Sequence, residues 1–185
     1  MNKKTLIILS IFVLFLTTIV FIGINNSKDT SLFERHNLSN KSVEEIVSYL
    51  EQRLDEDDKF FAGIYGDKLV LGDDKEQIEL ALPNGLFYLS IAPYINQTHP
   101  CTNHNLVTCR GELKNQVFQI EIIDLETNTV ISKRDISSSA NGFAGIWLPA
   151  NKNLSIKVTY NSLSTTTDIS TYSTSNTCLT KMKLV

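Results

Sequence analysis

The chain has 185 residues, of which 42% are hydrophobic and 20% are charged, and its formal net charge is −3 at pH 7. This composition is typical of a globular protein and excludes an intrinsically disordered chain. The 17 basic residues, which include Lys3 and Lys4 at the N-terminus, are outnumbered by 20 acidic ones. A surface that binds duplex nucleic acid usually has the opposite charge balance, so we expect no nucleic-acid partner.

The N-terminus carries an uncharged, mostly apolar run directly after Lys3 and Lys4. As a helix, residues 6–24 would be about 28 Å long, which is nearly enough to cross a membrane. A positive N-terminus followed by an apolar run is typical of an export signal. No small-residue cleavage site follows Ile24, which favours an uncleaved anchor over a cleaved signal. Residues 1–24 are therefore predicted to be a signal peptide or membrane anchor, with the body secreted or held outside the cytoplasm.

A polar tether and a helix are predicted next. Residues 25–41 are rich in polar side chains and are predicted to be the tether. Ser42 is predicted to begin a helix, because Glu45 three residues later completes a capping-box pattern. Its apolar residues recur at helical spacing up to an acidic cluster at 55–58 and are Val43, Ile46, Val47, Leu50 and Leu54. The acidic cluster is predicted either to mark the end of this helix or to start a second helical segment at Lys59, with a core face of Phe60, Phe61, Ile64 and Tyr65.

Beyond residue 67 the pattern changes to short strands separated by turn-forming residues. The first three are predicted to form a β-meander and span 68–71, 77–82 and 86–92. Six more are predicted at 117–124, 129–135, 142–148, 154–160, 164–170 and 178–184. The predicted fold class is α+β, with an N-terminal helical segment followed by antiparallel β-sheets and a small β-sandwich-like C-terminal part. We assign residues 42–98 to a helix plus meander and residues 99–185 to a C-terminal β domain.

The cysteines are the most informative residues. There are three, Cys101, Cys109 and Cys178, and the stretch that holds the first two also contains His99 and His104. Exported proteins that need only disulfides tend to carry cysteines in even number. Three sulfur atoms with imidazoles nearby indicate a site for a soft metal, either Cu(I) on three thiolates or Zn on three thiolates and one imidazole.

The spacing within this stretch constrains the site. Cys101 and His104 are three residues apart, which on one helical turn brings their Cβ atoms to about 5–6 Å, and Pro100 suits the first position of such a turn. A helix continued to Cys109 would rotate its sulfur by roughly 140° from His104, so the chain must turn between them. Cys178 can join only through the fold, and it shares an inward strand face with Thr180, Met182 and Leu184.

A disulfide is the alternative to metal binding. Cys101 could pair with Cys109, or Cys109 with Cys178, leaving the third thiol buried. The protein would then be a disulfide-stabilised surface β domain that binds a protein partner. A thiol oxidoreductase is disfavoured because the sequence contains no C-x-x-C motif. The residues by themselves leave the metal site and the disulfide both open.

Four motifs together resemble the CueP family of exported copper-binding proteins, over roughly residues 40–185. They are His99-Pro-Cys-Thr-Asn-His104, Cys109-Arg-Gly-Glu-Leu113, Asn141-Gly-Phe-Ala-Gly-Ile-Trp-Leu-Pro149 and Thr177-Cys-Leu-Thr180. The resemblance implies copper resistance or copper handling outside the cytoplasm. It implies Cys101, Cys109 and Cys178 as sulfur ligands, assisted by His104 or His99, with Phe143 and Trp147 packed behind the site.

The same resemblance makes reduction of Cu(II) to Cu(I) a hypothesis, because two thiols that form a disulfide release two electrons. The copper would then be retained, or passed to an exported cuproenzyme, and a thiol-disulfide reductase is a further candidate partner. The best-known family members are soluble and have a removable signal, whereas the apolar run of this chain lacks a good cleavage site.

Overall fold

The computed structural model describes residues 30–54 and 59–185. The predicted signal peptide or anchor at 1–24 and the first part of the predicted tether lie outside the described residues. The chain divides into two units at Asn37 and Leu38. In the first unit, a short helix, α2 (Leu32–Arg35), is capped by Ser31. Over the described ranges, no helix is both long enough and apolar enough to span a membrane.

Helix α3 (Val43–Glu51) begins where the sequence predicts. The Ser42 side chain accepts the backbone N–H of Glu45, and the Glu45 side chain accepts the backbone N–H of Ser42, which completes the capping box. The buried face of the helix is formed by Ile46, Val47, Leu50 and Glu51. The helix ends at Glu51, before the predicted end near residue 55, and Leu54 is exposed.

The second predicted helical segment is wrong. Residues Phe61–Ile64 form strand β1, which pairs antiparallel with β2 (Lys68–Gly72). Strand β3 (Gln77–Ala81) and the two-residue strand β5 (His104–Asn105) complete a sheet of order β3-β2-β1-β5. A short apolar run fits a helix or a strand equally well by spacing, and here the ladder to β2 decides for a strand.

The predicted meander is also wrong in its third strand. Strand β4 (Leu86–Ile91) leaves β3 and joins a second sheet of order β11-β4-β8. There it pairs antiparallel with β8 (Ala144–Pro149) and parallel with β11 (Cys178–Leu179). Five of its six residues are buried, on both faces, whereas β3 has no buried residue. A strand buried on both faces needs cover on each side, which the edge of the hairpin does not provide.

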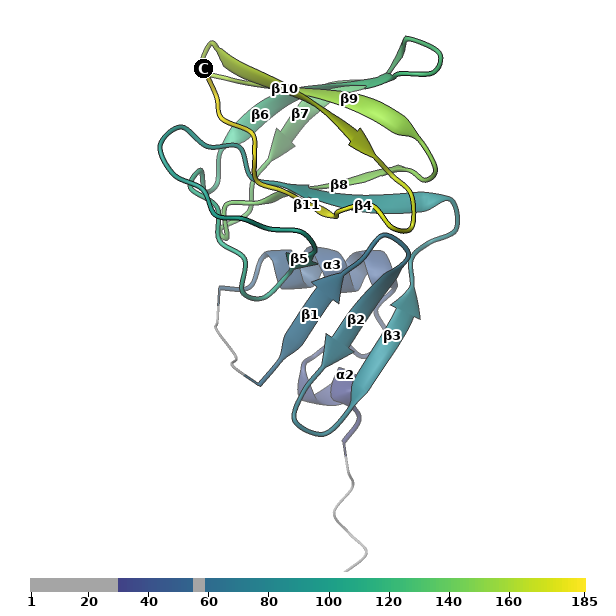
Figure 1. Cartoon of the computed structure of the whole chain (residues 1–185). Helices are drawn as coiled ribbons and strands as arrows, with labels where there is room; N and C mark the ends of the chain where they lie inside the picture. Colours follow the sequence, from purple (N-terminus) through teal and green to yellow (C-terminus); the bar gives the residue numbers. More distant parts are fainter. Residues whose placement is uncertain (1–29, 55–58) are drawn as a thin grey trace, which may run out of the picture. The chain divides into compact units, whose positions relative to one another are not determined.

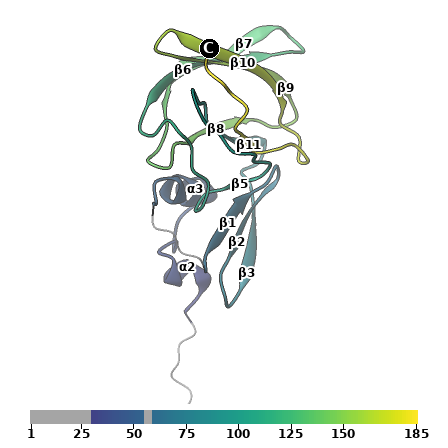
Figure 2. The ribbon, with the colours of Figure 1, turned by 60° about the vertical axis from the view of Figure 1, so that its left-hand side comes forward.

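A third sheet, of order β10-β9-β6-β7, covers one face of the second (Figures 1 and 2). Its strands are β6 (Val117–Asp124), β7 (Thr129–Ser137), β9 (Asn153–Tyr160) and β10 (Leu163–Ser170). One core joins the two sheets and includes Phe87, Leu89, Phe118, Ile120, Ile146 and Ile156. Helix α3 and the first sheet lie beyond the other face of β11-β4-β8 (Figures 1 and 2). The prediction of a chain rich in antiparallel sheets with few helices is confirmed.

The sequence predicts correctly which side chains of the C-terminal segment face inward, but the strand there is shorter than predicted. Pairing with β4 covers only Cys178 and Leu179, and a single further bridge joins Tyr94 to Lys183. The side chains nevertheless alternate as predicted: Cys178, Thr180, Met182 and Leu184 are buried, while Lys181 and Lys183 are exposed. Cys178 therefore faces the interior, at the end of the sheet that lies next to β5.

Candidate metal site

His104 is positioned by an edge strand rather than by a helical turn. In β5, His104 lies opposite Ile64 of β1. Its backbone N–H donates to the Thr177 hydroxyl oxygen at 3.1 Å, and that hydroxyl donates to the carbonyl of Ile64 at 2.6 Å. The predicted helical turn from Pro100 to His104 is therefore wrong. The backbone N–H of His104 thus has its hydrogen-bond acceptor in Thr177, the neighbour of Cys178. This bond holds the loop against the last strand.

Cys101 and Cys178 form a disulfide, with their Cα atoms 5.6 Å apart. The carbonyl of Thr102 accepts the backbone N–H groups of both Thr177 and Cys178 at 3.1 Å, which aligns the two cysteines. Neither disulfide considered from the sequence, Cys101 with Cys109 or Cys109 with Cys178, is the one observed. The sequence contains no signal for these contacts, because Thr102 and Thr177 are far apart along the chain.

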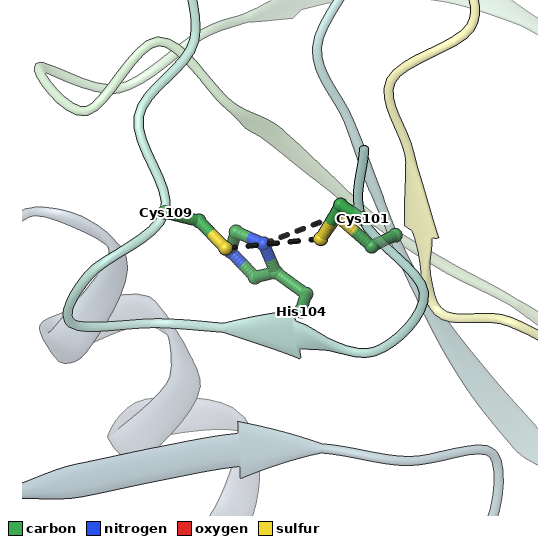
Figure 3. Close-up of side chains that lie close together, drawn as sticks. Cys101, His104 and Cys109 are labelled. Atoms are coloured by element: carbon green, nitrogen blue, oxygen red, sulfur yellow. Dashed lines mark hydrogen bonds between the residues drawn. A yellow bond between two sulfur atoms is a disulfide. The ribbon is translucent and has the colours of Figure 1, made fainter. Parts of the chain in front are cut away.

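Cys109 is a free thiol and is brought back to His104 by a tight turn. The side-chain oxygen of Asn105 accepts the backbone N–H groups of Val107 at 2.9 Å and Thr108 at 3.1 Å, as in an Asx turn. The Cys109 N–H donates to the Asn105 carbonyl at 3.1 Å. The predicted turn between His104 and Cys109 is confirmed. It places the Cys109 sulfur 3.8 Å from that of Cys101 (Figure 3).

Four of the five candidate residues meet in space. The ligand atoms of Cys101, His104, Cys109 and Cys178 all lie within 4.8 Å of one another. The His104 Nδ1 atom is 3.8 Å from the Cys178 sulfur, and both side chains are buried. His99 does not belong to this group and instead contacts the Phe143 ring edge, with centroids 6.1 Å apart. Three sulfurs and one imidazole nitrogen are a donor set for a soft metal.

Sequence reasoning missed one residue of this centre, Glu51. Its Oε1 atom lies 3.1 Å from His104 Nε2, at ion-pair distance though not aligned as a hydrogen bond, and both side chains are buried. An acidic residue in the last turn of a helix is usually exposed, and its charge opposes the helix dipole. The signal that could have found it is spacing, because Glu51 follows Val47 by four residues and thus lies on the apolar face of the helix.

The charges in the centre stabilise one another. Burial disfavours the charged form of His104, but Glu51 and Cys109 outweigh it and raise the pKa of His104 to about 9. Burial also acts to raise the pKa of Cys109, yet the hydrogen bond and charge of His104 bring it below its ordinary value. Burial acts to raise the pKa of Glu51, but His104 and the hydrogen bonds from Asn141 and Tyr88 outweigh it and lower that pKa. At neutral pH the His104 ring is therefore an imidazolium, and it lies between the Glu51 carboxylate and the Cys109 sulfur, whose thiolate form it favours.

Apolar and aromatic side chains surround the sulfurs. Phe143 packs on the His104 ring with centroids 4.4 Å apart, and it forms a small cluster with Ala92 and Cys178 against which Cys101 and Cys109 pack. The expectation that Phe143 lies behind the site is met. Trp147 contacts instead the Tyr88 ring, at 4.8 Å between centroids. Such surroundings limit the access of water to the sulfurs and restrict rotation of the imidazole.

Gly111 and Gly142 let the Cys109 loop approach the loop before β8. The Gly111 N–H donates to the Asn141 carbonyl at 2.7 Å, and a Cβ at either glycine would collide with the backbone of the other. Gly142 also has a φ of +86°, in the left-handed region that favours glycine. The close contact holds the Cys109 loop next to Asn141, and Asn141 in turn donates to Glu51.

Comparison with known proteins gives one family match and one similar solved structure. The family model described as periplasmic copper-binding protein CueP matches residues 45–183. The solved structure titled "Crystal Structure of S.CueP" is similar at 36% sequence identity with a TM-score of 0.79, covering 86% of this chain and 98% of that one. A search of curated proteins gives no match.

We predict that His104 stabilises the folded state in a pH-dependent way in metal-free protein. Its pKa is raised from 6.5 to about 9, so its contribution is fully present below pH 6.5 and is lost as the pH rises through about 9. The difference in free energy of unfolding between wild type and His104→Ala should shrink by roughly 2 to 3 kcal/mol across this window in denaturant titrations. A difference that stays constant or grows would contradict the assignment.

The thiol of Cys109 should titrate below the range of an ordinary cysteine while the Cys101–Cys178 disulfide is intact, because protonated His104 stabilises its thiolate. The ultraviolet absorbance of the thiolate measures this. His104→Ala should raise the pKa of Cys109, since burial and the charge of Glu51 are then opposed only by the hydrogen bond from the Asn105 N–H. His99→Ala is the control and should leave the titration in place. An unchanged midpoint in His104→Ala would show that the two groups are not coupled.

Proposed function

The chain belongs to the CueP family of periplasmic copper-binding proteins, and on that basis we propose that it binds Cu(I) outside the cytoplasm through Cys101, Cys109, Cys178 and His104. The observation that carries the proposal is the convergence of three sulfurs and one imidazole nitrogen within 4.8 Å. Thiolates are soft ligands and select Cu(I) and Zn over the oxygen-binding metals. Zinc is accordingly a second ion that the reduced site would hold in vitro.

The redox state of the sulfurs governs this binding. In the disulfide form, Cys101 and Cys178 are bonded to each other, so Cys109 and His104 remain as the free donors. Reduction of the disulfide yields two more thiols at positions already adjacent to these donors. Coordination removes the thiol protons, so the affinity rises with pH. We assign the nitrogen ligand to His104 rather than His99, because His99 lies outside the group.

The site also supports reduction of Cu(II). The thiols of Cys101 and Cys178 would each lose a proton and an electron as their sulfurs form the disulfide, and two Cu(II) ions would each gain one electron to become two Cu(I). The pairing is supported by the Cα separation of 5.6 Å. Cys109 is left reduced, 3.8 Å from the Cys101 sulfur, as a thiolate for the cuprous product. This replaces the Cys109–Cys178 bridge expected from the sequence.

Repeated reduction needs a source of electrons. A cavity of about 410 Å³ is lined by both disulfide cysteines together with Pro100, Thr102 and Thr180. This opening supports access of a thiol-disulfide reductase to the bond, and we propose such a protein as the reductant. An exported cuproenzyme is our proposed recipient of the copper. Both partners belong to the proposal of copper handling, either for resistance or for delivery.

Copper binding by the reduced full-length chain is the direct test. We expect about one Cu(I) per molecule in competition with a cuprous chelator, because the donor atoms form one cluster. Replacing Cys101, Cys109 or Cys178 by serine should weaken binding by more than the roughly 100-fold that loss of an outer-shell partner causes. His36→Ala, outside the cluster, is the control. Tight binding that survives the triple serine variant would refute the site and favour the alternative, a disulfide-stabilised domain that binds a protein partner.

Cupric reduction gives a second prediction. Mixing Cu(II) with the fully reduced protein, without any other reductant, should yield about two equivalents of Cu(I) and consume two thiols. Mass spectrometry of peptides should then find the Cys101–Cys178 disulfide and an unmodified Cys109. Cys109→Ser should still reduce copper but retain the product poorly. A protein that keeps three thiols while its copper stays cupric would bind the metal without redox activity.

A further inference from the structure

Glu51 is a buried carboxylate that the proposed function does not use. It lies on the apolar face of α3 and is 5% exposed, among Ile46, Val47 and Leu50. Burial of a carboxylate is costly unless several hydrogen bonds compensate for the lost water. A helix that served only to cover a sheet would have an apolar residue at this position, so the site of Glu51 calls for an explanation by its contacts.

Three donors hold the carboxylate of Glu51 in one orientation. Tyr88 and Ser90 of β4 each donate a hydroxyl to its Oε1 atom at 3.0 Å. Asn141, in the loop before β8, donates its amide to Oε2 at 2.6 Å. Both oxygens are thus occupied, and donors on two separate segments of the chain define their position. The carboxylate is a rigid reference point beside β5, where His104 lies.

The imidazole of His104 is held between this reference point and the sulfurs. Its Nε2 atom lies 3.1 Å from Glu51 Oε1, and its Nδ1 atom lies 3.8 Å from the Cys178 sulfur on the other side of the ring. The Phe143 ring packs on the imidazole with centroids 4.4 Å apart, which opposes a flip of the ring. In the neutral form of the ring, the negative charge of Glu51 favours the remaining proton on Nε2, which leaves the lone pair on Nδ1.

We propose that Glu51 is a positioning residue that acts through His104, fixing the proton on Nε2 and presenting Nδ1 to the metal. The inference rests on the proposed function for its use of a bound metal. A carboxylate held next to the second nitrogen of a metal-binding histidine orients the ring and makes the first nitrogen more basic. Glu51 itself is not part of the four-residue ligand cluster, so it acts on the metal only through His104.

The alternative is that Glu51 only joins α3 to β4. The variant Glu51→Gln separates the two roles, because the amide keeps the shape of the side chain but loses its charge. Glu112→Gln is the matched control. Glu112 also accepts several hydrogen bonds, from the backbone N–H groups of Ile95, Asn96 and Gln97, and none of these residues belongs to the metal-site cluster. Each variant is made in the full chain, with and without His104→Ala.

Cu(I) competition on the reduced proteins is the first measurement. Glu51→Gln should weaken binding by about 10-fold or more when His104 is present, within the 10- to 100-fold range of outer-shell changes. It should cause no further loss when His104 is already alanine, and Glu112→Gln should have no effect in either background. An equal loss in both backgrounds would mean that Glu51 is structural, and no loss in either would overturn the proposal.

The ring nitrogen resonances of His104 in metal-free protein are the second measurement and do not depend on copper. At a pH where the ring is neutral, wild type should show the proton on Nε2 in a single form that exchanges slowly with solvent. Glu51→Gln should shift these resonances and speed the exchange, while Glu112→Gln should not. A proton on Nδ1 in the wild type would overturn the proposal, even if Glu51→Gln did not fold. If no variant or wild type bound Cu(I), the proposed function would fail and these resonances would still decide the role of Glu51.

Discussion

The contact between Glu51 and His104 joins helix α3 to the cysteine loop at β5, and the rest of the site depends on it. Burying either group alone would be unfavourable, since each would lose its hydration without gaining a partner. Together they place a negative and a positive charge 3.1 Å apart beneath the sulfurs. The strands and loops that supply Tyr88, Ser90 and Asn141 must then lie around the same carboxylate. Helix α3, two sheets and the cysteine loop therefore surround one buried charge pair. The charge of His104 in this pair also favours the thiolate form of Cys109.

Local signals in the sequence predicted what local physics decides. The capping box at Ser42 and Glu45 located the start of α3, and alternation in the last segment gave the inward direction of Cys178. Four of the five candidate ligands also converge, as the cysteine pattern and the family resemblance indicated. The sequence predictions that were wrong concern contacts between segments far apart in the chain. The departure of β4 from the meander and the Cys101–Cys178 disulfide depend on segments far apart in the chain, and helical spacing could place Glu51 on the apolar face of α3 without identifying His104 as its partner.

In the proposed function, the same sulfurs serve two chemistries that exclude each other, disulfide formation and metal binding. A sulfur bonded to another sulfur is a poor ligand, and a thiolate bound to metal is protected from oxidation. Cys109 is the residue common to both states, because it remains a thiol beside the disulfide and would be a ligand after its reduction. The surrounding Phe143 and Ala92 keep the three sulfurs in a small apolar space in which exchange between the two states needs little movement.

The disulfide closes a loop of great length, since 77 positions separate its cysteines. In a chain-entropy model, a crosslink over that span disfavours the unfolded ensemble by roughly 4.5 kcal/mol, a large share of the stability of a typical domain. In the proposed function, opening the bond to receive an ion would give up this restraint, so the empty dithiol form would be the least stable state of the protein. An ion held by Cys101 and Cys178 together would tie the same two points of the chain again. Binding of the ion would thereby be linked to folding. A molecule with neither the disulfide nor a bound ion would be the state most exposed to proteolysis.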